Sequence, residues 1–348
     1  MYTKTILYRE IFEQPAVLSG LLQDNQAIID KIAIQVKAND IKHIVVVGRG
    51  SSGHACDYFV YLTEIFTKYL VKDLNPSIVT SYDGSVSLDN SLVIGVSQSG
   101  MAPDVLMCLQ KAVQCKSIVV SITNNLDSPI AKVADYHLYC NAGVEKSIAA
   151  TKSFSASMYL LMLIVRKLSD DSLFKEAPKN IVLGVTQLLK YAEDIVEVAK
   201  QLVNTKDMFV LSRGLNLAIA KESALKLSET SYIKAFGWSV AEFRHGPFAM
   251  VDSNTTALIF APSGRLQQEI LAMVDKLRAE QAKVIVVGDV FADQTYKVSP
   301  DIVVPDGTEI ETPFYNIVVA QLIANYVSSA KGIDTDNPRG LSKVTLTK

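Results

Sequence analysis

Residues 44–53 read IVVVGRGSSG, and this short stretch decides much of the fold. The four β-branched residues from Ile44 to Val47 favour a strand that is buried on both faces, as in a parallel sheet. The glycines and serines that follow suit a tight turn, after which a helical pattern runs from His54 to Leu70. A strand, a glycine turn and a helix in this order predict one unit of an α/β fold.

Short apolar runs continue this pattern along the chain, separated by helical stretches such as residues 104–113. We predict further strands at residues 78–80, 92–96, 117–121 and 137–139, and a helix from Glu10 to Leu22 before the first strand. Strands that alternate with helices predict a parallel sheet with helices on both faces.

The pattern then restarts in the second half of the chain. Residues 208–214, MFVLSRG, resemble residues 45–50, VVVGRG, and residues 257–264, ALIFAPSG, resemble residues 96–100, VSQSG. Residues 284–287 and 302–304 parallel the strands at 118–120 and around Leu138. We therefore predict two copies of one α/β fold of roughly 140 residues each.

The predicted organisation has four parts. An N-terminal helical segment covers residues 1–38, a first domain residues 39–180, a second domain residues 198–335 and a C-terminal tail residues 336–348. Helices near residues 155–168 and 180–203 lie between the two copies.

Composition excludes several classes of protein. The chain has 348 residues, of which 49% are hydrophobic and 20% charged, so it is neither disordered nor fibrous. The 34 basic and 36 acidic residues leave no basic excess, so we expect no nucleic-acid partner. The longest apolar run, Met158 to Val165, is too short to span a bilayer, and no secretion signal is evident, so we expect a cytoplasmic protein with no membrane partner.

Cysteines and histidines predict no metal site. The four cysteines show no C-x-x-C spacing, and the four histidines form no H-E-x-x-H pattern. We expect free thiols in a reducing compartment, no bound metal and no cofactor.

The glycine-rich stretch at residues 48–53 is the first candidate site. It matches the dinucleotide pattern G-x-G-x-x-G, but no acidic residue clearly ends the second predicted strand: Asp73 precedes that strand and Asp83 lies too far along. The serines favour a phosphate held at a helix N-terminus by hydroxyls and backbone N–H groups. A bare turn and a dinucleotide site remain alternatives. The candidate residues are Gly50, Ser51 and Ser52.

A second polar loop follows the strand at residues 92–96. Ser97, Gln98, Ser99 and Gly100 stand at the carboxyl end of this strand, and Pro103 suits the first turn of the next helix. Parallel sheets bind ligands at this rim. Two serine loops on neighbouring strands favour a small phosphorylated ligand over a bare serine-rich turn.

Charged residues in the second half suggest proton transfer. Glu222, Lys226 and Glu229 are four and seven positions apart, so they share one face of a helix that follows a glycine turn. This face is either an ordinary solvated surface or a source of a carboxylate that moves protons between the carbons of a sugar. His245 precedes Gly246-Pro247 in a turn and is either structural or an acid–base group that opens a sugar ring.

The C-terminal tail holds one more candidate. Lys343 is either a frayed surface residue or an amine that forms an imine with a carbonyl sugar.

Taken together, these motifs resemble the sugar-isomerase (SIS) family of phosphosugar-binding domains, present as a tandem pair. The chain is similar to the isomerase half of glucosamine-6-phosphate synthases and to free-standing SIS-type isomerases and deaminases. Further motifs that carry the resemblance are residues 149–152, AATK, residues 224–229, ALKLSE, and residues 338–343, PRGLSK. It implies two SIS domains, each a three-layer α/β/α sandwich with a parallel sheet.

The resemblance also implies roles for individual residues. Glu229 matches the carboxylate that moves a proton between C1 and C2, and Lys343 matches the lysine that forms an imine with the open keto sugar. His245 matches the ring-opening histidine, which the neighbouring subunit of a homodimer supplies. The positions that match substrate-binding or pocket-lining residues are Ser52, Ser97, Gln98, Ser99, Ile148, Glu222 and Lys226. Ser342 is a further candidate because it adjoins Lys343 in the tail.

The chain departs from the synthase pattern at two places. It reads Gly100-Met101-Ala102-Pro103-Asp104 where synthases have Gly-Glu-Thr-Ala-Asp, so Ala102 replaces a phosphate-binding threonine. The glycine loop likewise looks more like that of the free-standing enzymes. We also expect no glutaminase domain, because the chain begins almost directly with the SIS region.

We therefore expect a deaminase that converts glucosamine 6-phosphate to fructose 6-phosphate and ammonia. The alternatives are a plain aldose–ketose isomerase, a synthase-like aminotransferase without its glutaminase domain and a fructosamine-phosphate deglycase. Two non-enzymatic alternatives are a sugar-phosphate sensor and a regulatory subunit.

Overall fold

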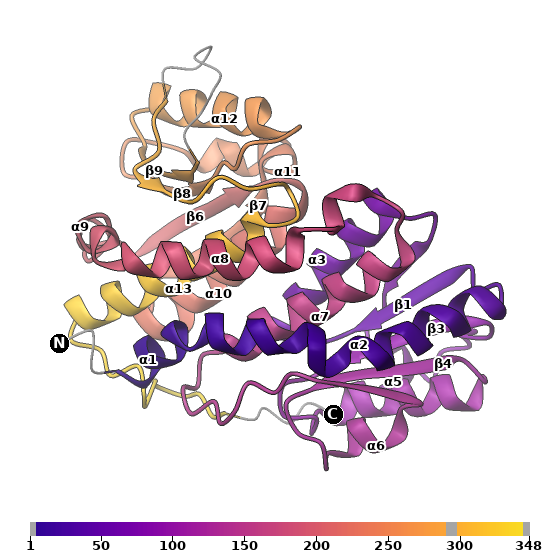
Figure 1. The fold of residues 1–348 in the computed structure, drawn as a ribbon. Helices are drawn as coiled ribbons and strands as arrows, with labels where there is room; N and C mark the ends of the chain where they lie inside the picture. The colour runs from indigo at the N-terminus through magenta and orange to yellow at the C-terminus, as the bar shows by residue number, and fades with distance from the viewer. Residues whose placement is uncertain (1–4, 290–297, 344–348) are drawn as a thin grey trace. The chain divides into compact units, whose positions relative to one another are not determined.

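A computed structural model describes residues 5–289 and 298–343. The chain folds into two compact units, each discontinuous in sequence (Figure 1). The first-sheet unit contains residues 16–145, 152–178 and 342–348. The second-sheet unit contains residues 1–15, 146–151 and 179–341. Residues 344–348 of the predicted tail and residues 1–4 of the predicted N-terminal segment lie outside the described residues.

The first-sheet unit is built on five parallel strands in the order β2-β1-β3-β4-β5. The strands are β1 (His43–Val47), β2 (Leu70–Asp73), β3 (Ser91–Val96), β4 (Ile118–Thr123) and β5 (Tyr136–Tyr139). The helices are α2 (Gln14–Ala38), whose first two residues belong to the other unit, α3 (Ser51–Phe66), α4 (Ser77–Thr80), α5 (Pro103–Gln114), α6 (Pro129–Val133) and α7 (Lys152–Leu168), with a 3₁₀ turn at Ser172–Phe174.

Burial on both faces of this sheet explains its continuous apolar runs. Val45, Val93 and Val119 pack on one face against buried side chains of α5 and α6. The alternate residues of β1, β3 and β4 are buried as well, and α3 and α7 pack together on the other face (Figure 1). This unit is therefore a three-layer α/β/α sandwich.

The second-sheet unit repeats the arrangement with five parallel strands in the order β10-β9-β8-β6-β7. The strands are β6 (Asp207–Ser212), β7 (Lys234–Ser239), β8 (Thr256–Phe260), β9 (Lys283–Gly288) and β10 (Ile302–Val303). The helices are α1 (Ile6–Phe12), α8 (Ala177–Lys190), which starts in the first-sheet unit, α9 (Ile195–Lys200), α10 (Leu217–Ser231), α11 (Val240–Arg244), α12 (Gln267–Ala279) and α13 (Thr312–Ala330). Short 3₁₀ turns cover Ala192–Asp194, Gly214–Asn216 and Pro247–Met250.

Matching strand orders confirm the predicted repeat. When β6 is matched with β1 and β8 with β3, the two sheets have the same order of parallel strands. In the second copy, α11 and α12 pack on one face of the sheet, while α10 and α13 pack against each other. The predicted fold class, two parallel-sheet α/β/α domains, is therefore confirmed.

The prediction was wrong at the second strand of the first copy. Residues 78–80 form helix α4, and the strand lies earlier, at Leu70–Asp73, where we predicted the end of a helix. This strand is an edge strand whose residues are mostly exposed, so it lacks the apolar run that marks a buried strand. Asp73 ends this strand. The prediction that no acidic residue clearly ends the second strand was therefore also wrong.

Strand β7 was missed for a similar reason. It is an edge strand of the second sheet, next to β6, and its residues alternate between exposed and half-buried. Its sequence, KAFGWS, contains no continuous apolar run.

Helices α7 and α13 are almost entirely buried. No helix in the described part of the chain is long and apolar enough to cross a membrane. Helix α13 carries polar residues that are buried inside the second-sheet unit. Asn316 donates to Asn216 at 2.7 Å, and Gln321 accepts from Gln14 at 2.8 Å. These pairs satisfy polar groups inside the second-sheet unit.

Candidate functional site

The glycine loop joins strand β1 to helix α3. Gly50 precedes the helix with a φ of +52°, a conformation that side chains disfavour, and it brings no side-chain cap to the first turn. Gly48 is equally constrained, because a Cβ there would lie 2.8 Å from the Ser52 carbonyl. The predicted turn is confirmed, and Ser51 and Ser52 are half-buried in the first turn of α3. This geometry suits an anion at the helix N-terminus.

The second serine loop follows β3, the direct neighbour of β1. The Ser97 hydroxyl accepts the Gly100 N–H at 3.2 Å, and the Ser99 hydroxyl accepts the Met101 N–H at 3.2 Å. Each hydroxyl still has its proton to donate. The Gln98 carbonyl accepts the Asn124 N–H at 2.9 Å, which ties the loop to the end of β4.

Close packing holds this loop in one shape. Gly100 has a φ of +67°, and a Cβ there would lie 2.1 Å from the Ser128 hydroxyl. Pro103 occupies the first turn of α5, as predicted. Both serine loops therefore present hydroxyls beside helix N-termini at the carboxyl end of one sheet, the usual ligand-binding rim of parallel sheets.

An ion pair links the glycine loop to the first turn of α5. Arg49 Nε donates to Asp104 Oδ2 at 2.7 Å, and the Asp104 side chain is buried while that of Arg49 is half exposed. The sequence reasoning quoted both residues but assigned neither a role. The available signal was that Arg49 is the only basic residue inside the glycine loop. Its partner, Asp104, lies 55 positions away in the sequence.

Lys343 is not a frayed surface residue. Its ammonium group donates to Glu145 Oε2 at 2.9 Å within the first-sheet unit. Glu145 is buried and also accepts the N–H and hydroxyl of Ser153, at 3.0 and 2.6 Å. Sequence reasoning missed Glu145, which precedes Ile148 and the motif at residues 149–152 in the same loop. Ser342, the neighbour of Lys343, is exposed.

The pKa of Glu145 reflects these contacts. Burial raises it, but the charge of Lys343 and the hydrogen bonds from Ser153 and Lys343 together hold it below its ordinary value. Glu145 is therefore an anion although it is buried.

In the second-sheet unit, three of the charged residues of α10, Glu222, Lys226 and Glu229, form one cluster. Lys226 Nζ lies 3.3 Å from Glu222 Oε1 and 2.6 Å from Glu229 Oε2. Lys226 and Glu222 are buried, while the Glu229 side chain is 22% exposed. The alternative of an ordinary solvated face is therefore wrong.

Charge balance keeps Lys226 protonated. Burial lowers its pKa, but the carboxylates of Glu222 and Glu229 outweigh burial and raise it above the ordinary value. The cluster thus holds the partly accessible carboxylate of Glu229 against the buried ion pair of Lys226 and Glu222. The helix begins after Gly214, whose φ is +64°, as the predicted glycine turn requires.

His245 and Ile148 lie apart from this cluster in sequence. His245 caps α11, is exposed and precedes Gly246, which has a φ of +144°, so the predicted turn is confirmed. Ile148 is half-buried in the loop at residues 146–151. Buried Glu10 of α1 holds this loop by accepting the N–H groups of Lys146 at 2.5 Å and Ser147 at 3.2 Å.

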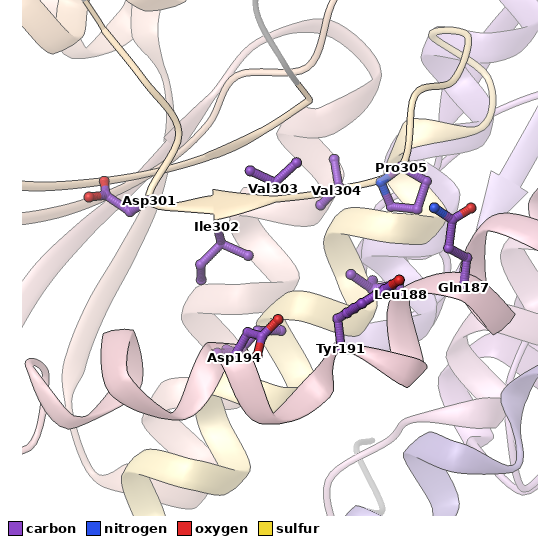
Figure 2. Close-up of a pocket in the computed structure, with 10 residues that line it drawn as sticks. Gln187, Leu188, Tyr191, Asp194, Asp301, Ile302, Val303, Val304 and Pro305 are labelled. Atoms are coloured by element: carbon purple, nitrogen blue, oxygen red, sulfur yellow. The ribbon is translucent and has the colours of Figure 1, made fainter.

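A separate cavity of about 430 Å³ lies at the edge strand β10 (Figure 2). Tyr191 and Asp194 line it on one side, and Asp301 and Pro305 on the other. None of the residues that line this cavity belongs to either serine loop, the α10 cluster or the Lys343 pair.

Comparison with known proteins confirms the resemblance inferred from the motifs. Residues 38–167 and 201–329 each match the family model of the SIS domain. The chain belongs to the SIS domain family. The two matched ranges contain every strand of the two parallel sheets described above.

Relatives of this tandem SIS chain include a glutamine–fructose-6-phosphate aminotransferase (isomerizing) of Aquifex aeolicus. The two are 34% identical over 343 residues, which cover 98% of this chain and 57% of the relative. The SIS chain thus spans less than three fifths of the length of this curated relative.

Solved structures agree. The C-terminal domain of the glucosamine-fructose-6-phosphate aminotransferase of Francisella tularensis is 29% identical, with a TM-score of 0.86 over 96% of this chain and 98% of that one. A glucosamine-6-phosphate deaminase of Thermotoga maritima has the same fold at 21% identity, with a TM-score of 0.76 over 99% of this chain and 100% of that one.

Proposed function

We propose that this tandem SIS protein is a phosphosugar isomerase that acts as a deaminase, converting glucosamine 6-phosphate and water to fructose 6-phosphate and ammonia. The observation that carries the proposal is the α10 cluster. Two of its three charged groups are buried and paired, and the third, Glu229, is partly accessible. A carboxylate held in this way suits proton transfer between adjacent carbons.

The serine loops supply the phosphate subsite of the proposal. Ser52, Ser97 and Ser99 carry hydroxyls beside the N-termini of α3 and α5, and Gly50, Ser51 and Gln98 belong to the same loops. Phosphate oxygens accept hydrogen bonds from hydroxyls and from the N–H groups of first helical turns.

The proposed reaction begins when His245 opens the sugar ring. Glu229 removes the C2 proton and returns it at C1, so that the aldehyde becomes an alcohol and C2 becomes an imine. Water adds at C2, and the C2 nitrogen leaves as ammonia. Lys343 can replace ammonia at C2 through its own imine before water releases the ketose. Lys226, itself paired with Glu222, holds Glu229. Ile148 and Ser342 complete the proposed binding residues.

Two departures from the synthase pattern favour the deaminase over the synthase reaction. They lie at the glycine loop and at the Met101-Ala102-Pro103 turn. Ala102 cannot supply the hydroxyl that the synthase pattern has at this position. A plain aldose–ketose isomerase would use the same groups without releasing ammonia.

The experiment that tests the proposal is a paired product assay. Purified protein is incubated with glucosamine 6-phosphate, and ammonia and fructose 6-phosphate are measured together. Equal release of both, abolished in Glu229→Gln but retained in the exposed control Glu280→Gln, supports the deaminase. Isomerisation of hexose phosphates without ammonia would identify the plain isomerase, and ligand binding without turnover would identify a sensor.

We also propose that the protein acts as a homodimer in which His245 serves the partner's substrate. Inactive Glu229→Gln and His245→Ala subunits are mixed, dissociated and re-associated. Recovery of part of the wild-type activity supports sharing, because some hybrid sites then contain both functional groups. Verified hybrid dimers without activity would show that each subunit uses its own histidine.

A further inference from the structure

We propose that Glu145 is the fixed counter-ion of the iminium that Lys343 forms with the sugar, an inference that rests on the proposed imine step. The Glu145 carboxylate touches the reacting atom itself, since its Oε2 lies 2.9 Å from Lys343 Nζ. Glu145 is not among the candidate residues that the sequence predicted.

The contacts of Glu145 hold it in one position. Its Oε1 accepts the Ser153 N–H at 3.0 Å, and its Oε2 accepts the Ser153 hydroxyl at 2.6 Å. Ser153 lies in the first turn of the buried helix α7, so the carboxylate is anchored to a rigid element. Lys152, the neighbouring cation, donates to the Val144 carbonyl at 2.9 Å.

Imine formation leaves the charge at this site unchanged. A lysine ammonium and a ketone combine to give a protonated imine and one molecule of water, so one positive charge is present before and after the step. A buried carboxylate that pairs with the ammonium can therefore pair equally with the iminium. Because a buried carboxylate without a neighbouring positive charge is costly, Glu145 favours the iminium over a neutral imine.

The same pairing explains how the tail is positioned. Lys343 is separated from Glu145 by 198 positions in the sequence, and 28% of its side chain is exposed. The lysine is thus held beside its counter-ion while part of its side chain remains exposed. Glu145 acts at the reacting nitrogen and has no role in binding the phosphate.

The test separates imine formation from sugar-phosphate binding. Wild type, Glu145→Gln and Asp30→Asn are incubated with fructose 6-phosphate and cyanoborohydride, and the reduced adduct on Lys343 is measured by mass spectrometry. Asp30 pairs with Lys167 at 2.7 Å elsewhere in the same unit, so Asp30→Asn removes a comparable but partly exposed ion pair. Binding of glucitol 6-phosphate, which lacks a carbonyl group, is measured in parallel.

We expect Glu145→Gln to form the Lys343 adduct at least about tenfold more slowly than wild type, with its Kd for glucitol 6-phosphate within about twofold. Asp30→Asn should behave as wild type in both assays. An adduct that forms equally fast in Glu145→Gln would overturn the counter-ion role. A wild-type protein that yields no adduct on Lys343 would instead overturn the imine step of the proposed function.

A second variant covers the case in which Glu145→Gln does not fold. Ser153→Ala keeps the carboxylate but removes its 2.6 Å hydrogen bond. We expect the adduct to form about two- to fivefold more slowly in Ser153→Ala. An unchanged rate in this variant would count against the proposal.

Discussion

Replacing Lys226 by methionine should destabilise the second-sheet unit strongly. The substitution removes the only positive charge between Glu222 and Glu229, whose oxygens lie 3.3 and 2.6 Å from Lys226 Nζ. At an effective dielectric constant of about 20, the two contacts correspond to attractions of about 5 and about 6 kcal/mol, which the desolvation of the lysine offsets in part. Removing one partner of a buried pair leaves a net cost of about 3–5 kcal/mol.

Urea unfolding followed by tryptophan fluorescence measures this loss. The chain has a single tryptophan, Trp238 of β7, and this strand packs directly on α10. With a slope of about 2 kcal/mol per M urea, Lys226→Met should lower the transition midpoint by about 2 M. The double variant Glu222→Gln/Lys226→Met should recover at least about half of the loss, because it removes the buried negative charge of Glu222 together with the positive charge of Lys226.

The matched control is Lys200→Met on α9. Lys200 pairs with Glu197 at the same i,i+3 spacing, at 2.5 Å, but both side chains are more than half exposed. Exposed pairs of this kind contribute less than about 1 kcal/mol. A Lys226→Met midpoint that falls no further than that of Lys200→Met, or a double variant that recovers nothing, would refute the electrostatic account of the cluster.

Three further predictions concern other parts of the protein. Gly100→Ala should weaken binding of a sugar phosphate by at least about tenfold in isothermal titration, because its Cβ would lie 2.1 Å from the Ser128 hydroxyl; unchanged affinity would mean that the loop shape is not needed. Glu10→Gln should speed amide hydrogen exchange across residues 146–151 by about tenfold, and equal rates would show that the loop is held by other contacts. Glu145, whose pKa is held below its ordinary value when folded, stabilises the protein above the unfolded-state pKa of about 4.3 and loses this contribution as the pH falls through the lower folded value. The stability difference between wild type and Glu145→Gln should therefore shrink below about pH 4, and a constant difference down to pH 2 would contradict this linkage.

Buried strands were predictable from the sequence, and edge strands were not. Strands β1, β3, β4, β6, β8 and β9 are buried on both faces, so each appears as a continuous apolar run. Edge strands β2 and β7 contact fewer apolar side chains, so their sequences carry a weaker signal. Ile78 and Val79 misled the prediction because they pack on the core from a short helix.

The loop positions were predictable because their chemistry is local. Gly50, Gly100, Gly214 and Gly246 all adopt positive φ values, and each adjoins a candidate motif found in the sequence. A glycine at the end of an apolar run indicates such a turn without any knowledge of distant residues.

The sequence by itself determined the repeat, the class of fold, the serine loops and the family. It left open whether the charged face of α10 is solvated and whether Lys343 is frayed, and it did not identify Glu145 or Glu10. Only the tertiary structure decided these points, because burial and ion pairing depend on residues far apart in the chain, as in the pair between Glu145 and Lys343. A periodic pattern reports what its own segment can form, whereas the environment of a charge is set by everything packed around it.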